Sequence, residues 1–151
     1  LAGGRGGSIG AESANPGLIH EPLGGPATCV RIFLSVFDVH INYSPYHAAV
    51  RSIAHKDGAH TNALNPESAE DNESNLLVLE HPTRGYPVAA VRQVAGMIAR
   101  TIVCSAEEGQ VLQRGQRIGG RAGVTALLHH DRWSAVLIPT FGLTWALSAD
   151  T

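Results

Sequence analysis

The chain has 151 residues, of which 44% are hydrophobic and only 16% are charged, and its formal net charge is −2. This composition excludes a highly charged, disordered protein, and the near balance of acidic and basic residues gives no electrostatic reason to expect nucleic acid as a partner. The 17 glycines and 8 prolines leave little room for long helices, so they predict many short elements joined by turns.

The first part of the chain, residues 1–28, is rich in glycine, proline, serine and alanine and lacks the charged and apolar regions of a signal peptide. We expect a flexible segment here, and a protein whose true start lies upstream of Leu1. No stretch of the sequence reaches the ~18 to 20 continuous apolar residues of a membrane span, so no transmembrane segment is expected. Cys29 and Cys104 lie beside apolar residues without metal or redox spacing, which favours small, buried side chains.

Strand signals begin after this segment. Residues 29–37 are rich in β-branched and aromatic side chains and follow a Pro/Gly turn, so they predict a strand. Residues 42–45 favour a turn, and the weak alternation of residues 46–53 indicates a second strand. The polar residues 55–75 predict a long loop without structure of its own, and such loops are usually functional or mobile.

Two hairpins are predicted further along the chain. The apolar runs 76–80 and 86–94 are joined by the turn-like residues 81–85 and predict the first hairpin. Residues 94–104 are compatible with a short helix or with a switch to a strand near their end. Glycines at both ends of an alternating run predict the second hairpin within residues 107–119. The fold class expected is therefore mostly β with one or two short helices, as a barrel-like or sandwich-like single domain that the chain need not contain in full.

Asp38 and His40 directly follow the first predicted strand. Alternate residues of an extended segment share one face, so a carboxylate and an imidazole at these positions can address one site, the carboxylate orienting or charging the imidazole. The alternative interpretation of the same residues is a turn-forming aspartate beside a partly exposed histidine. The spacing by itself leaves both open.

Other kinds of site have weaker support in the sequence. The 8 histidines include His55 with His60, and His129 beside His130, but neither pair matches an established zinc pattern, so we expect no metal. No nucleophile elbow and no phosphate-binding glycine loop is found. The only Gly-Ser dipeptide is Gly7-Ser8.

Four runs carry a resemblance to a known family. They are RIFLSVFDVHIN (31–42), NALNPESAEDNESN (62–75), VRQVAGMIARTIVC (91–104) and EEGQVLQRGQRIG (107–119). In this order and spacing, they resemble the phosphatidylserine decarboxylase proenzymes of the short archaeal and bacterial type. One such run would be a weak signal, whereas four in register make the resemblance specific.

The resemblance implies a mostly β carboxy-lyase that cuts itself at a Gly-Ser bond and converts the serine into a pyruvoyl cofactor on the smaller of two chains, an α/β chain pair. The pyruvoyl carbonyl would form a Schiff base with the amine of phosphatidylserine and act as the electron sink for loss of CO₂, leaving phosphatidylethanolamine. A phospholipid substrate further implies peripheral contact with the cytoplasmic face of a membrane. Asp38 and His40 fall on the family's aspartate and histidine, the aspartate being implicated in activation of the cleavage serine.

The resemblance ends at Gly119. In the family a Gly-Ser segment follows within a few residues, whereas residues 120–151 contain none, and the hydroxyls of Thr125 and Ser134 do not follow glycine. We therefore divide the chain into a flexible segment 1–28, a decarboxylase-like core 29–119 and a divergent tail 120–151, such as a reading-frame shift or gene fusion would produce. The expectation is that this chain lacks the cleavage serine.

Two other functions are considered for this chain besides the enzyme. The glycine-bounded run 107–119 is also similar to hairpins of biotinyl and lipoyl carrier domains, but the only lysine, Lys56, is not in a carrier's Met-Lys-Met context. A non-catalytic, β-rich lipid-binding or scaffold module stays open as the alternative function.

Overall fold

The computed structural model describes the backbone of residues 9–13, 23–24, 27–32, 40–61, 71–120, 123–129, 136–140 and 143–147, and the side chains of residues 23–24, 40–61 and 71–120. The elements in these ranges are all strands: β1 (Ile9–Ser13), β2 (Ala27–Ile32), β3 (Ile41–Tyr43), β4 (Ala48–Lys56), β5 (Ser74–Glu80), β6 (Pro87–Val94), β7 (Val103–Cys104), β8 (Val111–Leu112), β9 (Arg117–Gly120), β10 (Gly123–His129), β11 (Val136–Thr140) and β12 (Leu143–Leu147).

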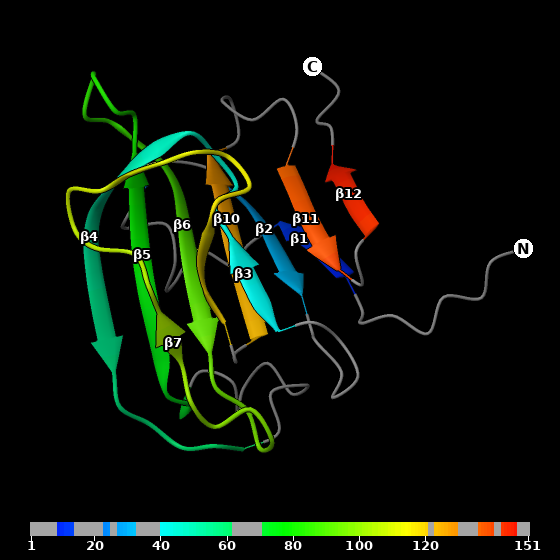
Figure 1. The fold of residues 1–151 in the computed structure, drawn as a ribbon. Coiled ribbons are helices and arrows are strands. Elements are labelled where there is room, and N and C mark those ends of the chain that lie inside the picture. The colour runs from blue at the N-terminus through cyan, green and yellow to red at the C-terminus, as the bar shows by residue number, and fades with distance from the viewer. Residues whose placement is uncertain are drawn as a thin grey trace, which may run out of the picture.

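The strands form three antiparallel sheets. The largest has seven strands in the order β1-β2-β10-β6-β5-β4-β8, the second has three in the order β3-β9-β7, and β11 pairs with β12. Figure 1 shows the large sheet curling so that β3 and β7 lie in front of β5, β6 and β10, which gives a half-barrel. The predicted fold class, mostly β and barrel-like, is confirmed.

The hairpin of β5 and β6 forms the centre of the core. Their apolar runs are buried almost throughout rather than on alternate residues, which is typical of strands covered on both faces. Ile118 from β9 belongs to the same buried cluster, so the small sheet covers one face of the large one. The turn between β5 and β6 closes with Gly85 at φ 67°, a conformation that favours glycine. This predicted hairpin is confirmed.

Two other predicted strands and the predicted loop agree with the structure in part. The strand expected at 29–37 begins earlier, as β2, and its residues 33–37 lie outside the described part of the chain. The strand expected at 46–53 is β4, which continues to Lys56. The loop expected at 55–75 is therefore shorter than predicted, because β4 enters it at one end and β5 begins at Ser74 at the other.

The helix considered for residues 94–104 is wrong. β6 ends at Val94, an irregular turn follows, and β7 begins at Val103, which agrees with the alternative of a late switch to a strand. Met97 and Ile98, which a helix would place on one face, are 56% and 70% exposed. Because these side chains have no core to pack against, the hydrophobic period gives a helix nothing to stabilise it.

The hairpin predicted within residues 107–119 is also wrong in its pairing. β8 pairs with β4 in the large sheet, whereas β9 pairs with β3 and β7 in the small one. Gly109 and Gly115 both have positive φ, at 83° and 79°, and turn the chain before and after β8. The two halves of the run consequently bury Leu112 and Ile118 from different sheets.

The tail predicted to begin at residue 120 contributes β10, which lies between β2 and β6 in the large sheet. The boundaries of the three predicted segments remain predictions. Among the residues that the structure describes, none forms a helix with the length and hydropathy needed to span a bilayer.

Candidate active site

His40 immediately precedes β3 and is half-buried. Ile41 pairs with Gly120, so His40 lies where β9 ends. A Cβ built on Gly120 would come within 2.5 Å of the His40 carbonyl oxygen, so only glycine allows β9 to approach this closely. Asp38, the other predicted catalytic residue, lies outside the described residues.

A chain of buried amides crosses the core beside His40. The Gln93 Nε2 donates to Asn42 Oδ1 at 2.7 Å and to the Val103 carbonyl oxygen at 3.3 Å, while Asn75 Nδ2 donates to Gln93 Oε1 at 3.1 Å. Gln93 is fully buried, and Asn42 and Asn75 are each 4% exposed. These bonds join β5 and β6 of the large sheet to β3 of the small one, and they fix the strand that follows His40.

Gly119 completes this arrangement from β9. A Cβ at this position would lie 2.6 Å from Gln93 Nε2 and closer still to the Val103 carbonyl oxygen. A side chain here would therefore separate β9 from β7 and from the amide of Gln93.

The chain returns to the large sheet at once after β9. Gly123 pairs with Val94 and Val124 with Gln93, so the first residues of β10 run alongside the buried amide. We call the region formed by His40, Asn42, Gln93, Gly120 and Gly123 the strand junction. The beginnings of β3 and β10 and the ends of β6 and β9 meet there, near the lower end of the molecule in Figure 1.

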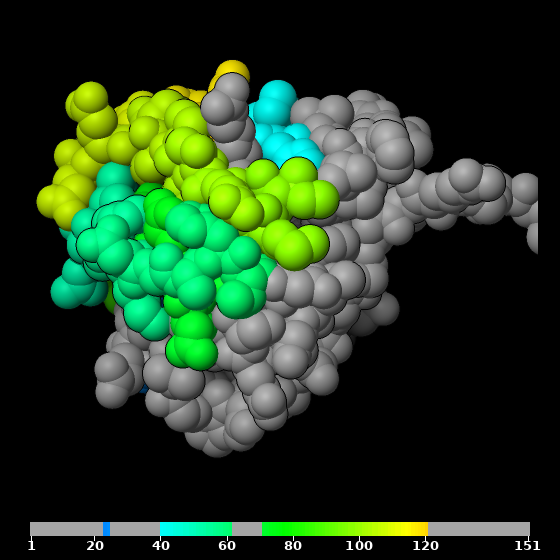
Figure 2. All heavy atoms as spheres, turned by 90° about the horizontal axis from the view of Figure 1, so that it is seen from below, coloured from blue at the N-terminus to red at the C-terminus, as the bar shows by residue number. Residues whose placement is uncertain are grey.

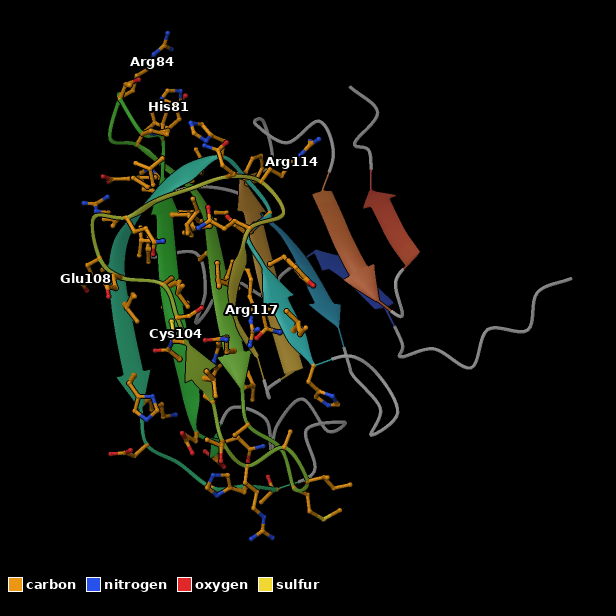
Figure 3. The ribbon with its side chains drawn as sticks, viewed as in Figure 1. His81, Arg84, Cys104, Glu108, Arg114 and Arg117 are labelled. Carbon is orange, nitrogen blue, oxygen red and sulfur yellow. The ribbon has the colours of Figure 1, made fainter. Side chains whose placement is uncertain are left out.

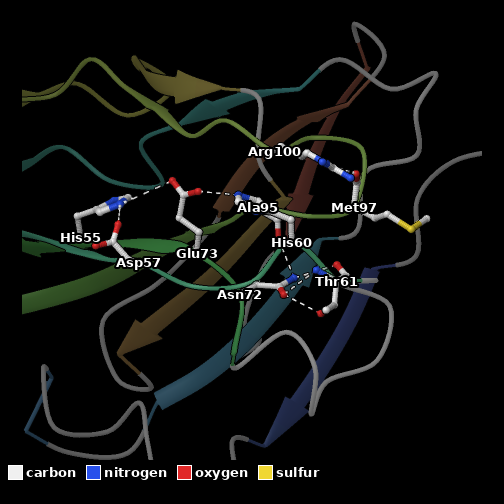
Figure 4. Close-up of polar contacts among 9 residues, drawn as sticks. All are labelled: His55, Asp57, His60, Thr61, Asn72, Glu73, Ala95, Met97 and Arg100. Atoms are coloured by element: carbon white, nitrogen blue, oxygen red, sulfur yellow. Dashed lines mark hydrogen bonds and ion pairs between the residues drawn. The ribbon is translucent and has the colours of Figure 1, made fainter.

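A second polar cluster lies at the same end of the sheet (Figure 4). Asn72 is fully buried; its Nδ2 donates to the carbonyl oxygens of Thr61 and Ala95, and its Oδ1 accepts from the Thr61 amide and hydroxyl. Beside it, His60 Nε2 lies 2.8 Å from Glu73 Oε2, and His55 Nε2 lies 3.6 Å from Glu73 Oε1. This cluster ties together the segments that follow β4, precede β5 and follow β6.

Of the histidines considered for a metal site, the structure describes the side chains of His55 and His60. His55 and His60 do converge on one carboxylate, but no group of three or more His, Cys, Asp or Glu side chains in the described part of the chain could hold a metal ion. The side chain of His129 and all of His130 lie outside it. His81 lies on the β5–β6 turn, at the opposite end of the sheet in Figure 3, where it contacts Tyr86 with ring centroids 5.0 Å apart.

Two further side chains, Cys104 and Tyr46, pack against the core. Cys104 is a free, half-buried thiol whose Sγ lies 3.7 Å from the Ala106 carbonyl oxygen, so the buried position predicted for it is met only in part; the Cys29 side chain is not described. Burial raises the pKa of Tyr46 to about 12. Its hydroxyl is the one buried polar side-chain atom, among those described, without a hydrogen-bond partner.

Sequence reasoning missed the amides. Asn42, Asn72, Asn75 and Gln93 stand in the sequence only as parts of matching runs or of a loop, although all four are buried in the structure. An isolated amide within an apolar strand, as Gln93 is in β6, was the available signal, because such a group is tolerated in a core only when its hydrogen bonds are made.

The sequence of this chain is similar to those of known proteins. A family model described as phosphatidylserine decarboxylase matches residues 17–122, which include the whole strand junction except Gly123. The phosphatidylserine decarboxylase proenzyme of Magnetococcus marinus is 44% identical over 94 residues, 62% of this chain and 42% of the relative. That of Granulibacter bethesdensis is 46% identical over 94 residues, 62% of this chain and 38% of the relative.

A proenzyme of the same name from Pelagibacter ubique is 41% identical over 111 residues, 73% of this chain and 51% of the relative. The chain thus spans about two fifths to one half of the length of these relatives. No solved structure matches it.

Proposed function

Because this chain belongs to the phosphatidylserine decarboxylase family, we propose that its β-rich core serves the conversion of phosphatidylserine to phosphatidylethanolamine and CO₂ at a membrane surface. The observation that carries the proposal is the family match over residues 17–122, within which buried amides fix β3, the strand that follows His40, and Ile41 pairs with the end of β9. The relatives are named as decarboxylase proenzymes, which does not favour the alternative of a non-catalytic lipid-binding module.

We assign Asp38 and His40 the handling of protons at the strand junction. Where a serine hydroxyl is supplied, as in the Val124→Ser variant described below, the imidazole of His40 would accept its proton, and the carboxylate of Asp38 would hold the imidazole and stabilise its charged form. Asn42 lies two residues from His40 and accepts a hydrogen bond from Gln93, which supports a fixed position for the base. The pairing of a larger and a smaller chain and docking on the cytoplasmic face of a membrane belong to the same proposal.

The family's pyruvoyl group, which supplies the electron sink for decarboxylation, requires a serine directly after a glycine. The residues that follow β9 in this chain do not fit that requirement. Two residues separate Gly120 from Gly123, and the position beside Gln93 that follows Gly123 is Val124, which has no hydroxyl. Because residues 120–151 contain no Gly-Ser, we derive no step through the group and infer that these residues do not supply it.

Intact-mass measurement of the purified chain, with a decarboxylation assay on detergent-dispersed phosphatidylserine, tests both parts. The chain should keep its full mass and release no CO₂. The Val124→Ser variant places a hydroxyl after Gly123 and beside Gln93, so it should cleave after Gly123 and release CO₂ in a reaction blocked by hydroxylamine. Adding His40→Ala should abolish the cleavage.

Leu143→Ser is the matched control, because it also creates a Gly-Ser dipeptide, after Gly142, but in β12, which pairs only with β11. It should remain uncleaved. Self-cleavage of the unmodified chain would refute the inference about the missing serine. A folded Val124→Ser chain that neither cleaves nor decarboxylates would count against the function assigned to the strand junction.

A further inference from the structure

The turn that follows β6 presents two large apolar side chains to solvent. Met97 is 56% exposed and Ile98 is 70% exposed, and they are neighbours at the tip of residues 96–100, which we call the apolar turn. Adjacent exposed side chains of this size mark an interaction site more often than scattered ones do.

The apolar turn is held by hydrogen bonds rather than left loose. Within it, the Gly96 amide donates to the Ala99 carbonyl oxygen at 2.9 Å, the Arg100 amide donates to Ile98 at 3.1 Å, and Arg100 Nε donates to Met97 at 3.0 Å. At its base, the Ala95 amide donates to Glu73 and the Ala95 carbonyl accepts from buried Asn72. The two apolar side chains therefore project from a shaped support, so burying them requires little further ordering of the backbone.

The apolar turn lies at the same end of the molecule as the strand junction. It begins two residues after Val94, which pairs with Gly123. Figure 2, seen from below, shows the residues after β6 beside those at the end of β4, and Figure 4 shows Met97 and Arg100 beyond the polar cluster. A surface contacted by the turn would face the site to which lipid must come.

We propose that the apolar turn inserts Met97 and Ile98 into the interfacial region of a bilayer that contains anionic phospholipid, with the exposed Arg100 at the level of the headgroup phosphates. This inference rests on the proposed function, which makes a membrane lipid the substrate. Side chains of this kind gain free energy when they leave water for the acyl boundary, and a guanidinium beside them is attracted to anionic headgroups.

The size of the turn favours a bilayer over a protein partner. A stable protein interface buries about 800 Å² on each side, whereas the apolar turn offers two large side chains, with Val103 of β7 next in the chain at 37% exposed. The carboxylates behind the turn, Asp57 and Glu73, contact the imidazoles of His55 and His60. Arg100 is thus the charged group of the turn itself.

Flotation of the full chain with vesicles of phosphatidylcholine, with and without phosphatidylserine, tests the proposal. The chain should float with both and more strongly with the anionic vesicles. The double variant Met97→Ser with Ile98→Ser should bind at least about tenfold more weakly to both, because two apolar side chains no longer enter the interface. Arg100→Gln should weaken binding severalfold to anionic vesicles only.

Val111→Ser is the matched control. Val111 is 48% exposed, but β8 pairs with the opposite end of β4, at Ala48–Ala49, so its loss should leave vesicle binding unchanged. Thermal melts should agree within a few degrees for all variants. A chain that does not float, a double variant that floats as well as the parent, or an equal loss in Val111→Ser would overturn the proposal, as would a dimer abolished by the double variant in the absence of vesicle binding.

The result is separable from the proposed function. Cleavage and decarboxylation are measured in detergent without a bilayer, so the double variant should leave them unchanged in the Val124→Ser background. A Val124→Ser chain that is active in detergent but does not float would refute the membrane role of the apolar turn. One that floats but is inactive in detergent would refute the assigned reaction.

Discussion

Gln93 illustrates how one polar side chain can organise an apolar core. It is fully buried in β6, yet its amide oxygen and nitrogen both find partners, in Asn75, Asn42 and the Val103 carbonyl. A buried amide is costly only when its hydrogen bonds are unmade, and here the bonds join β6 to three other strands, β3, β5 and β7. Gln93 therefore determines how the small sheet sits on the large one beside His40.

Replacing Gln93 with leucine should lower the free energy of unfolding by about 2–4 kcal/mol, because the Asn42 oxygen and the Asn75 amide would be left without this buried partner. Urea denaturation followed by circular dichroism measures the change. Gln113→Leu is the control, since Gln113 is exposed, and its effect should stay within about 0.5 kcal/mol. Equal effects of the two substitutions would show that the amide chain adds nothing to stability.

The burial of Tyr46 predicts that the stability of the fold decreases at alkaline pH. Burial raises its pKa from 10.0 to about 12, so the folded state holds the phenolic proton more tightly than the unfolded state does. The resulting stability is fully present below about pH 10 and is lost as the pH rises towards about 12. Tyr46→Phe should therefore show a smaller fall of the melting temperature over this range than the parent chain.

At neutral pH the same substitution should be neutral or stabilising by about 1 kcal/mol, because it removes a buried hydroxyl without a partner. Parallel alkaline melting curves for the parent and Tyr46→Phe would contradict the assignment of the pH dependence to this side chain.

At the scale of elements, β9 depends on two glycines that bring it against its neighbours. Gly119 lies against Val103 and Gln93, and Gly120 lies against the His40 carbonyl oxygen. In the sequence, Gly119 is predicted to end a hairpin, whereas Gly120 is predicted to begin the divergent tail. Their actual use is close packing between strands, which a single sequence does not distinguish from turn formation.

Gly119→Ala should cost about 3 kcal/mol of unfolding free energy, because a methyl group would overlap backbone atoms of β7 that cannot move aside without separating the strands. Gly115→Ala is the comparison: it has open space around its Cβ position and a positive φ of 79°, so it should cost only about 1 kcal/mol. Chemical denaturation of the two variants measures the difference, and a smaller loss for Gly119→Ala would refute the close packing.

At the scale of the molecule, the large sheet unites the family core with residues beyond it. β10 pairs with β2 on one side and β6 on the other, so it bridges the β1–β2 pair and the central hairpin. The family model ends at residue 122, just before this strand. If residues 120–151 are needed to complete the large sheet, their removal should lower the stability of the fold.

Removal of residues 121–151 should abolish cooperative thermal unfolding, because β6 would lose the strand that pairs with residues 89–94 and expose an apolar edge. Calorimetry and light scattering of the truncated chain measure this, and aggregation is expected. A truncated chain that melts as the parent does would instead support the division of the chain at residue 120.

Local order along the chain is enough to predict the abundance of turns, the β class and the hairpin of β5 and β6 with Gly85 in its turn, and four runs in register are enough to indicate the family. The catalytic roles of both Asp38 and His40 remain predictions. Only the tertiary structure decided that β8 and β9 enter different sheets, that the amides of Asn42, Asn75 and Gln93 join, and that Met97 and Ile98 face solvent. The physical reason is that strand pairing and burial are set by contacts between residues far apart in the chain, which local hydrophobic periodicity does not encode.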